Sequence, residues 1–176
     1  MRTCILDIET TDLKADFGRI ICAVIKEYGS RRKATVYKPT NYKNDKDVVL
    51  RIRNRLEDFD IMVGYYSKGF DLPFLNSKLF FMGEKRIKKM FHVDTYYVVK
   101  NNMRTISRKS LERIGDTLQL DEKKMNLSIK VWNEARDGNE EAISKICERC
   151  LSDVEMTEKV YDSLLRSGMI DTLKRT

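Results

Sequence analysis

The sequence predicts an α/β fold in which helices flank a mixed five-stranded sheet. Three apolar runs separated by short turn-like segments occupy the first 37 residues, a pattern typical of consecutive antiparallel strands. A helical segment then leads to a fourth apolar run, and almost everything beyond residue 107 has helical periodicity. A chain that returns to a sheet through a helix adds a parallel strand, so the sheet is expected to be mixed.

The first three strands are expected at residues 2–8, 20–28 and 33–37. The segments between them contain Asp16-Phe17-Gly18 and Gly29-Ser30, which are turn signals. Short connections of this kind join neighbouring antiparallel strands. These residues therefore predict a three-stranded meander.

A helix is expected at residues 46–58, where four apolar residues recur at helical spacing between charges: Val48, Val49, Ile52 and Leu56. The apolar run 61–64 should be a buried strand parallel to the first. The next helix is expected to open at Leu72 and end near Gly83, with Pro73 in the first turn, where its missing N–H is tolerated.

Residues 91–93 predict a short fifth strand, and Asp94 is placed to cap a helix over 95–100. Three further helices are expected at residues 107–119, 126–136 and 139–167, with a break at Gly138-Asn139 between the last two. No linker or internal repeat is visible, so we expect a single domain over residues 1–176.

Composition favours a cytoplasmic protein with polyanionic partners. Lys and Arg total 34 against 27 acidic residues, which gives a net charge of +7. Basic clusters such as Arg31-Arg32-Lys33 contribute, although any one of them could simply be a solvated face. No stretch of 18 apolar residues is present, so we expect no membrane span.

Four cysteines are present, and two of them, Cys147 and Cys150, form a CxxC. No second CxxC and no nearby His completes a zinc set, so these two are interpreted as neighbours on a helix. Cys4 and Cys22 fall in expected strands and are interpreted as small core residues. We expect no disulfide.

The first strand ends in two carboxylates spaced two residues apart, Asp7 and Glu9. Side chains alternate faces along a strand, so both point the same way. Paired carboxylates repel each other and resist desolvation, and a divalent cation offsets both costs. The pair predicts metal ligands; the alternative is a polar strand end that faces water.

Two further acidic signals follow in the chain. Asp71 ends a polar loop at the start of an apolar helix, where it could be only a helix cap. Asp153 lies within the last helix between apolar neighbours, where it could be a solvated surface residue.

Taken together, these acids resemble the three motifs of the DEDD superfamily of 3′–5′ exonucleases. The motifs are Asp7-Ile8-Glu9, Phe70-Asp71-Leu72-Pro73-Phe74-Leu75 and Asp153-Val154 followed by Thr157. The chain is most similar to the stand-alone predicted exonucleases related to the proofreading domain of family B DNA polymerases. This resemblance covers residues 3–165 and implies a ribonuclease H-like fold.

The resemblance implies a metal-dependent 3′–5′ exonuclease acting on single-stranded or frayed nucleic acid, DNA or RNA. Asp7, Glu9, Asp71 and Asp153 would be the metal-binding and catalytic carboxylates. Two Mg²⁺ or Mn²⁺ ions roughly 4 Å apart would activate water and stabilise the leaving oxygen. In the family the first acid, here Asp7, bridges both ions.

The resemblance also implies a substrate site. Thr10, Thr11 and Leu13 match positions that hold the terminal nucleotide through main-chain donors and an apolar wedge. Phe70 and Tyr66 could stack on bases, and equally they could be core aromatics.

The chain departs from the family pattern around the last motif. Relatives carry a Tyr four residues before the last Asp or a His five before it, where this chain has Arg149 and Glu148. The lone histidine, His92, is interpreted as structural, and Tyr66 replaces a family Asn. Two alternatives therefore stay open: a nucleic-acid-binding protein with weak or no catalysis, and a structure-specific endonuclease. The oligomeric state is open as well.

Overall fold

The computed structural model describes residues 1–30, 34–122 and 125–171. The basic cluster at 31–33, which includes the predicted start of the third strand, lies outside these ranges. The described residues form a five-stranded sheet in the order β3-β2-β1-β4-β5. Its strands are β1 (Thr3–Thr10), β2 (Ile20–Glu27), β3 (Thr35–Tyr37), β4 (Ile61–Gly64) and β5 (Phe91–Asp94).

Strand directions agree with those expected from the connections. The first three strands pair antiparallel as a meander, and β4 lies parallel to β1 on its other side. β5 then pairs parallel with β4. β1 is consequently the central strand, paired with β2 from Cys4 to Thr10 and with β4 from Thr3 to Ile5.

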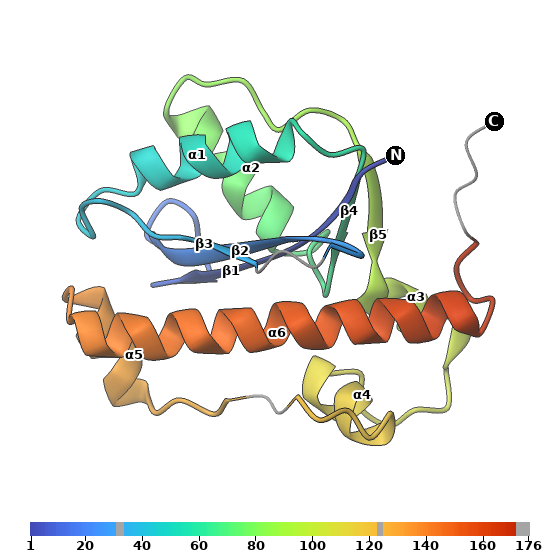
Figure 1. The fold of residues 1–176 in the computed structure, drawn as a ribbon. Coiled ribbons are helices and arrows are strands. Elements are labelled where there is room, and N and C mark those ends of the chain that lie inside the picture. The colour runs from blue at the N-terminus through green and yellow to red at the C-terminus, as the bar shows by residue number, and fades with distance from the viewer. Residues whose placement is uncertain (31–33, 123–124, 172–176) are drawn as a thin grey trace.

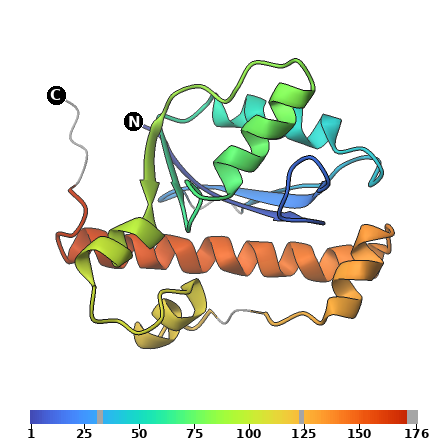
Figure 2. The same cartoon turned by 180° about the vertical axis from the view of Figure 1, so that it is seen from behind.

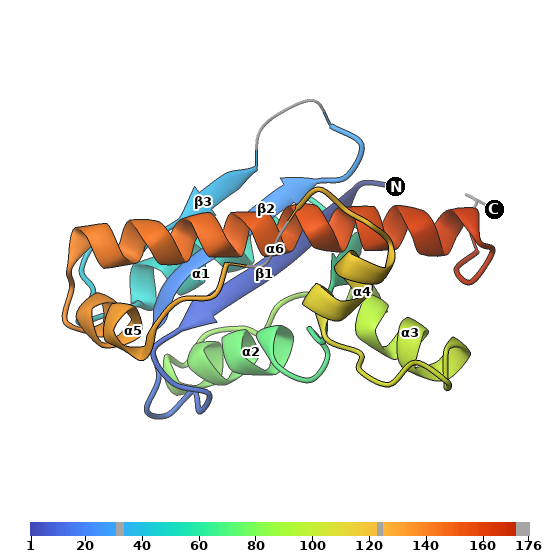
Figure 3. The same ribbon diagram turned by 90° about the horizontal axis from the view of Figure 1, so that it is seen from below.

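Helices cover both faces of this sheet (Figure 1). They are α1 (Lys46–Leu56), α2 (Asp71–Phe81), α3 (Thr95–Asn102), α4 (Leu111–Thr117), α5 (Ile129–Arg136) and α6 (Glu140–Arg166). α1 and α2 lie on one face and the long α6 on the other, as the reverse view also shows (Figure 2). Seen from below, α6 crosses β1 and β2 (Figure 3), and it contacts both strands.

Two predicted helices begin later than expected. The helix predicted at 107–119 starts at Leu111, because the Ser110 side chain accepts a hydrogen bond from the N–H of Arg113 and caps it. The helix predicted at 126–136 starts at Ile129, after an extended Ser128. The break before α6 is as predicted: Gly138 has a φ of +90°, and the Asn139 side chain caps the helix.

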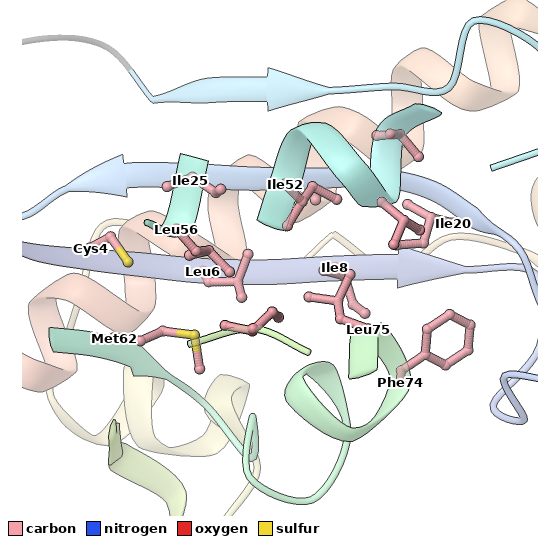
Figure 4. Packing of buried hydrophobic residues seen from close by; sticks show 14 of the residues in the cluster. Cys4, Leu6, Ile8, Ile20, Ile25, Ile52, Leu56, Met62, Phe74 and Leu75 are labelled. Carbon is pink, nitrogen blue, oxygen red and sulfur yellow. The ribbon is translucent and has the colours of Figure 1, made fainter. Parts of the chain in front are cut away.

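β1 divides its side chains between two cores. Cys4, Leu6 and Ile8 face the core beneath α1 and α2, whose packing is drawn in Figure 4. Ile5 belongs to the core beneath α6. Strand alternation therefore directs Asp7 and Glu9 toward the α6 side of the sheet.

The four cysteines are free thiols, as predicted, and three of them are buried: Cys4, Cys22 and Cys150. Among the described residues, no helix has both the length and the apolar character needed to cross a membrane.

Asp94 holds the loop that follows β4. Its carboxylate accepts hydrogen bonds from the N–H groups of Tyr66 (2.9 Å) and Lys68 (2.8 Å). The same group caps α3 by accepting from the N–H of Tyr96, which confirms the cap expected from the sequence. One buried side chain thus connects the end of β5, the start of α3 and the 65–70 loop.

Gly64 allows this loop to turn back on β4. A Cβ atom at Gly64 would lie 2.3 Å from Ser67 Oγ and 2.5 Å from Ser67 Cβ. Ser67 is fully buried, and its hydroxyl hydrogen-bonds His92 Nε2 at 2.8 Å. Burial lowers the pKa of His92 to about 4, so this histidine is neutral at pH 7.

We predict that Gly64→Ala destabilises the fold by about 1 to 3 kcal/mol, because the added methyl group overpacks a buried contact. Urea denaturation measures the free energy of unfolding. Adding Ser67→Gly should recover part of the loss, which a double-mutant cycle detects as coupling. Strictly additive effects would show that the contact with Ser67 is not the cause.

Candidate metal centre

An open cleft of about 720 Å³ lies where β1 and β4 end. Because these two strands are parallel, their carboxyl ends and the loops that follow them reach the same edge of the sheet. All four predicted carboxylates, Asp7, Glu9, Asp71 and Asp153, line this cleft. The structure therefore brings together acids that are up to 146 residues apart in the sequence.

Asp7, Glu9 and Asp153 form the tightest group. One oxygen from each lies within 4.8 Å of the others. Asp7 and Glu9 come from the face of β1 that α6 covers, and Asp153 is a buried residue of α6. The two alternatives, a strand end that faces water and a solvated helix surface, do not describe these acids. Asp153 is buried, and the β1 acids do not simply face bulk water.

Asp71 joins the group through the backbone of β1. Pairing between β1 and β4 extends only to Ile5 and Val63, and beyond it the Ile8 N–H donates to Asp71 Oδ1 at 3.0 Å. The helix cap is Phe70, and Asp71 is the first residue of α2. Its carboxylate is therefore fixed by the strand that carries Asp7.

Burial and mutual repulsion shift the titration of these acids. Burial, followed by the charges of Asp71, Glu9 and Asp153, raises the pKa of Asp7 well above its ordinary range. Burial raises the pKa of Asp71 to about 7, although hydrogen bonds from its own N–H and that of Ile8 oppose the shift. Accumulated negative charge of this kind favours binding of a cation.

Arg149 extends from α6 into the carboxylates. Its Nε donates to Glu9 Oε1 at 2.8 Å, and its Nη2 lies 3.4 Å from Asp153 Oδ2. Glu148, the other position at which the resemblance to DEDD exonucleases implies a water-orienting residue, is exposed and does not line the cleft. Of the two departures at the last motif, only Arg149 faces the centre.

Cys150 contacts the centre from the same helical turn. Its thiol lies 3.2 Å from Asp7 Oδ2 and donates to this carboxylate. Sequence reasoning missed this contact, because a cysteine beside apolar residues is usually an ordinary core thiol. The signal that could have found it is helical spacing, since Cys150 lies three residues before Asp153.

Aromatic rings form one wall of the cleft. Tyr66 has a φ of +61°, uncommon for a residue with a side chain, and its ring lies over Gly69, where a Cβ would approach to 2.4 Å. It meets Tyr96 edge-to-face at 5.0 Å between centroids and remains 45% exposed. Phe70 also lines the cleft, half-buried against Phe74.

The predicted nucleotide-holding residues separate into two groups. Leu13 is 77% exposed and lines the cleft together with Lys14. Thr10 and Thr11 instead hydrogen-bond within the 10–19 loop: the Thr10 hydroxyl donates to Asp12 O, and the Thr11 N–H donates to Arg19 O. The main-chain donor expected at Thr11 is therefore already engaged.

Other cleft residues come from segments that no motif marked. Lys109 lines the cleft, and its carbonyl accepts a hydrogen bond from the Tyr65 hydroxyl at 2.7 Å. His92 does not line it, in agreement with a structural role.

Comparison with known proteins identifies the fold family. A family model described as the RNase_H superfamily matches residues 4–165. The chain belongs to the RNase_H superfamily. Membership confirms the ribonuclease H-like fold that the motifs implied, and members of this superfamily are typically nucleases that use divalent metals.

A solved structure has the same fold. The family B DNA polymerase from the hyperthermophilic archaeon Pyrobaculum calidifontis superposes with a TM-score of 0.77 at 18% identity. The match covers 96% of this chain and 25% of the polymerase chain, so the chain spans about a quarter of that protein. No curated protein matches the sequence significantly.

The residues of this RNase_H superfamily member fit a hard divalent cation. Mg²⁺ and Mn²⁺ prefer oxygen ligands, and the clustered donors of Asp7, Glu9 and Asp153 are all carboxylate oxygens. The hydrogen bonds from Ile8 to Asp71 and from Cys150 to Asp7 hold two of the acids in place, as outer partners do in metal sites.

We predict that Asp71→Asn raises the stability of the metal-free protein relative to wild type, and that this gain is larger at pH 8 than at pH 4. A raised carboxyl pKa contributes stability below the unfolded value near 4, and this contribution is lost as pH rises through about 7. The uncharged asparagine keeps an acceptor for Ile8 and avoids that loss, so the difference between variant and wild type should grow by about 4 kcal/mol. Chemical denaturation in a chelator at each pH measures it.

The control is Asp116→Asn, which makes the same chemical change on the exposed surface of α4. The same measurements on this variant give the reference with which the effect of Asp71→Asn is compared. A constant difference between wild type and Asp71→Asn from pH 4 to pH 8 would contradict the raised pKa.

Proposed function

We propose that the protein is a metal-dependent 3′–5′ exonuclease of the DEDD type that hydrolyses phosphodiester bonds of single-stranded or frayed nucleic acid. One observation carries the proposal: three carboxylates from β1 and α6 lie within 4.8 Å of one another at an open cleft, with Asp71 beside them. In a member of the RNase_H superfamily, this arrangement supports metal-assisted hydrolysis.

Asp7, Glu9, Asp71 and Asp153 would hold Mg²⁺ or Mn²⁺, which when bound supplies an activated water and stabilises charge on the leaving oxygen. Asp7 would serve both halves of the centre, a role supported by the charges of Glu9, Asp153 and Asp71, which all act on its carboxyl. Glu9 and Asp153 would act on the side of the attacking water, and Asp71 on the side of the leaving group.

The walls of the cleft suit a nucleic acid strand. Tyr66 and Phe70 offer ring surface on which bases can stack, and this stacking tolerates any sequence. Lys14 and Lys109 add positive charge where the phosphate backbone would pass. Exposed Leu13 at the edge of the cleft would act as a wedge at a strand end, which favours cleavage from an end over internal cleavage.

One observation favours a second candidate, a nucleic-acid-binding protein with weak or no catalysis. Arg149 forms ion pairs with Glu9 and Asp153 at the position where relatives orient the attacking water. Loss of a water-orienting group slows proton transfer by about 10²- to 10⁴-fold. The two candidates therefore differ in rate more than in substrate binding.

We predict that 5′-labelled single-stranded DNA or RNA is shortened from its 3′ end in Mn²⁺ or Mg²⁺. Asp7→Ala should reduce the rate at least 10³-fold, on the order expected when a metal site is lost, whereas Asp116→Ala on exposed α4 should leave it unchanged. Gel electrophoresis resolves the products. A labelled circle should stay intact; its cleavage would indicate an endonuclease, and intact linear substrate at micromolar protein would indicate the binding protein.

We predict that Tyr66→Asn weakens binding of single-stranded nucleic acid about tenfold, as expected for the loss of one stacking ring. Asparagine tolerates positive φ, so the change removes the ring without adding backbone strain. Fluorescence anisotropy of a labelled oligonucleotide with Ca²⁺ in place of Mn²⁺ measures binding. Phe80→Ala removes a ring that is 77% exposed on α2 and outside the cleft, and it should have no effect.

A further inference from the structure

Arg149 contacts the carboxylates that a metal ion would need. Its Nε donates to Glu9 Oε1 at 2.8 Å, and its Nη2 lies 3.4 Å from Asp153 Oδ2. These two residues supply two of the three clustered donors of the candidate centre. The guanidinium therefore neutralises charge that would otherwise be available to a divalent cation.

The guanidinium also has partners outside the carboxylates. Its Nη1 donates to the Met125 carbonyl at 2.9 Å, and its central carbon lies 5.8 Å from the centroid of the Trp132 ring on α5. The side chain is only 16% exposed. These contacts give Arg149 a defined position that does not depend on Glu9 or Asp153 alone.

A guanidinium and a divalent cation cannot share these carboxylates without cost. Both are positive and would lie within a few ångströms of each other in a partly buried site, where water screens their repulsion poorly. Arginine stays charged at any physiological pH, so deprotonation cannot relieve the conflict. A bound metal ion must therefore displace the guanidinium, or it binds with lower affinity.

We propose that Arg149 competes with the divalent cation for Glu9 and Asp153 and thereby sets the metal affinity of the centre. The inference rests on the proposed function, because it assumes that these carboxylates bind metal. With little metal, Arg149 holds Glu9 and Asp153 together against their mutual repulsion. As metal concentration rises, the cation takes over these ligands and the guanidinium keeps its contacts to Met125 and Trp132.

The opposite role is a positioning one, in which Arg149 holds Glu9 in the orientation that metal needs. The two roles predict opposite changes in metal affinity when Arg149 is replaced. Removing a competitor tightens metal binding, whereas removing a positioning residue weakens it. A binding measurement separates them without any measurement of catalysis.

The experiment measures Mn²⁺ binding by isothermal titration calorimetry on chelator-stripped wild type, Arg149→Gln and Arg149→Lys. Competition predicts that Arg149→Gln binds Mn²⁺ about tenfold more tightly or better, because a nearby positive charge is removed. Arg149→Lys keeps the charge and should stay close to wild type. Lys145→Gln removes an exposed cation one turn earlier on α6, where it pairs with Glu141, and should change the affinity less than about twofold.

Equal or weaker Mn²⁺ binding by Arg149→Gln, with normal binding by wild type, would overturn the competition alone. Absence of saturable binding in every variant would overturn both the competition and the proposed function. If Arg149→Gln does not fold, Mg²⁺ titration of wild type followed at the Arg149 Nε–H resonance decides the question. Competition predicts that this resonance shifts as the bond to Glu9 breaks, and an unchanged resonance at saturating Mg²⁺ would rule it out.

Discussion

The site depends on negative charge held where water screens it poorly. Asp7, Glu9, Asp71 and Asp153 all line one cleft, and burial and mutual repulsion raise the pKa values of Asp7 and Asp71. Such a cluster costs folding free energy unless an opposite charge or hydrogen-bond donors compensate it. The surrounding structure supplies both kinds of compensation, and a divalent cation would supply more.

Each compensating contact comes from an element that the fold already places beside β1. β4 separates from β1 beyond Ile5, so the Ile8 N–H is available to Asp71 at the start of α2. α6 crosses the other face and brings Cys150 to Asp7 and Arg149 to Glu9. The order and direction of the strands around β1 thus determine which groups can contact the acids.

The substrate wall has a different structural origin. Asp94 fixes the 65–70 loop through two backbone N–H groups while it caps α3, so one buried carboxylate orients both Tyr66 and Tyr96. Because Gly69 has no side chain, the Tyr66 ring packs over it, and Tyr66 lines the cleft. Tyr66 thereby presents an aromatic surface to the cleft.

The sequence by itself determined the strands and helices of the fold and placed the first two acids on one face of a strand. Strand alternation places Asp7 and Glu9 on one face, 61–64 forms the predicted strand, and Asp94 caps α3. These features are set by the spacing of apolar and polar residues and by hydrogen bonds between residues that are close in the sequence. Only the tertiary structure decided that Arg149 faces the centre while Glu148 faces solvent, and that Cys150 contacts Asp7. Helical periodicity fixes the angle between neighbouring side chains, but the face that meets the sheet is chosen by the packing of α6 against strands more than a hundred residues away in the chain.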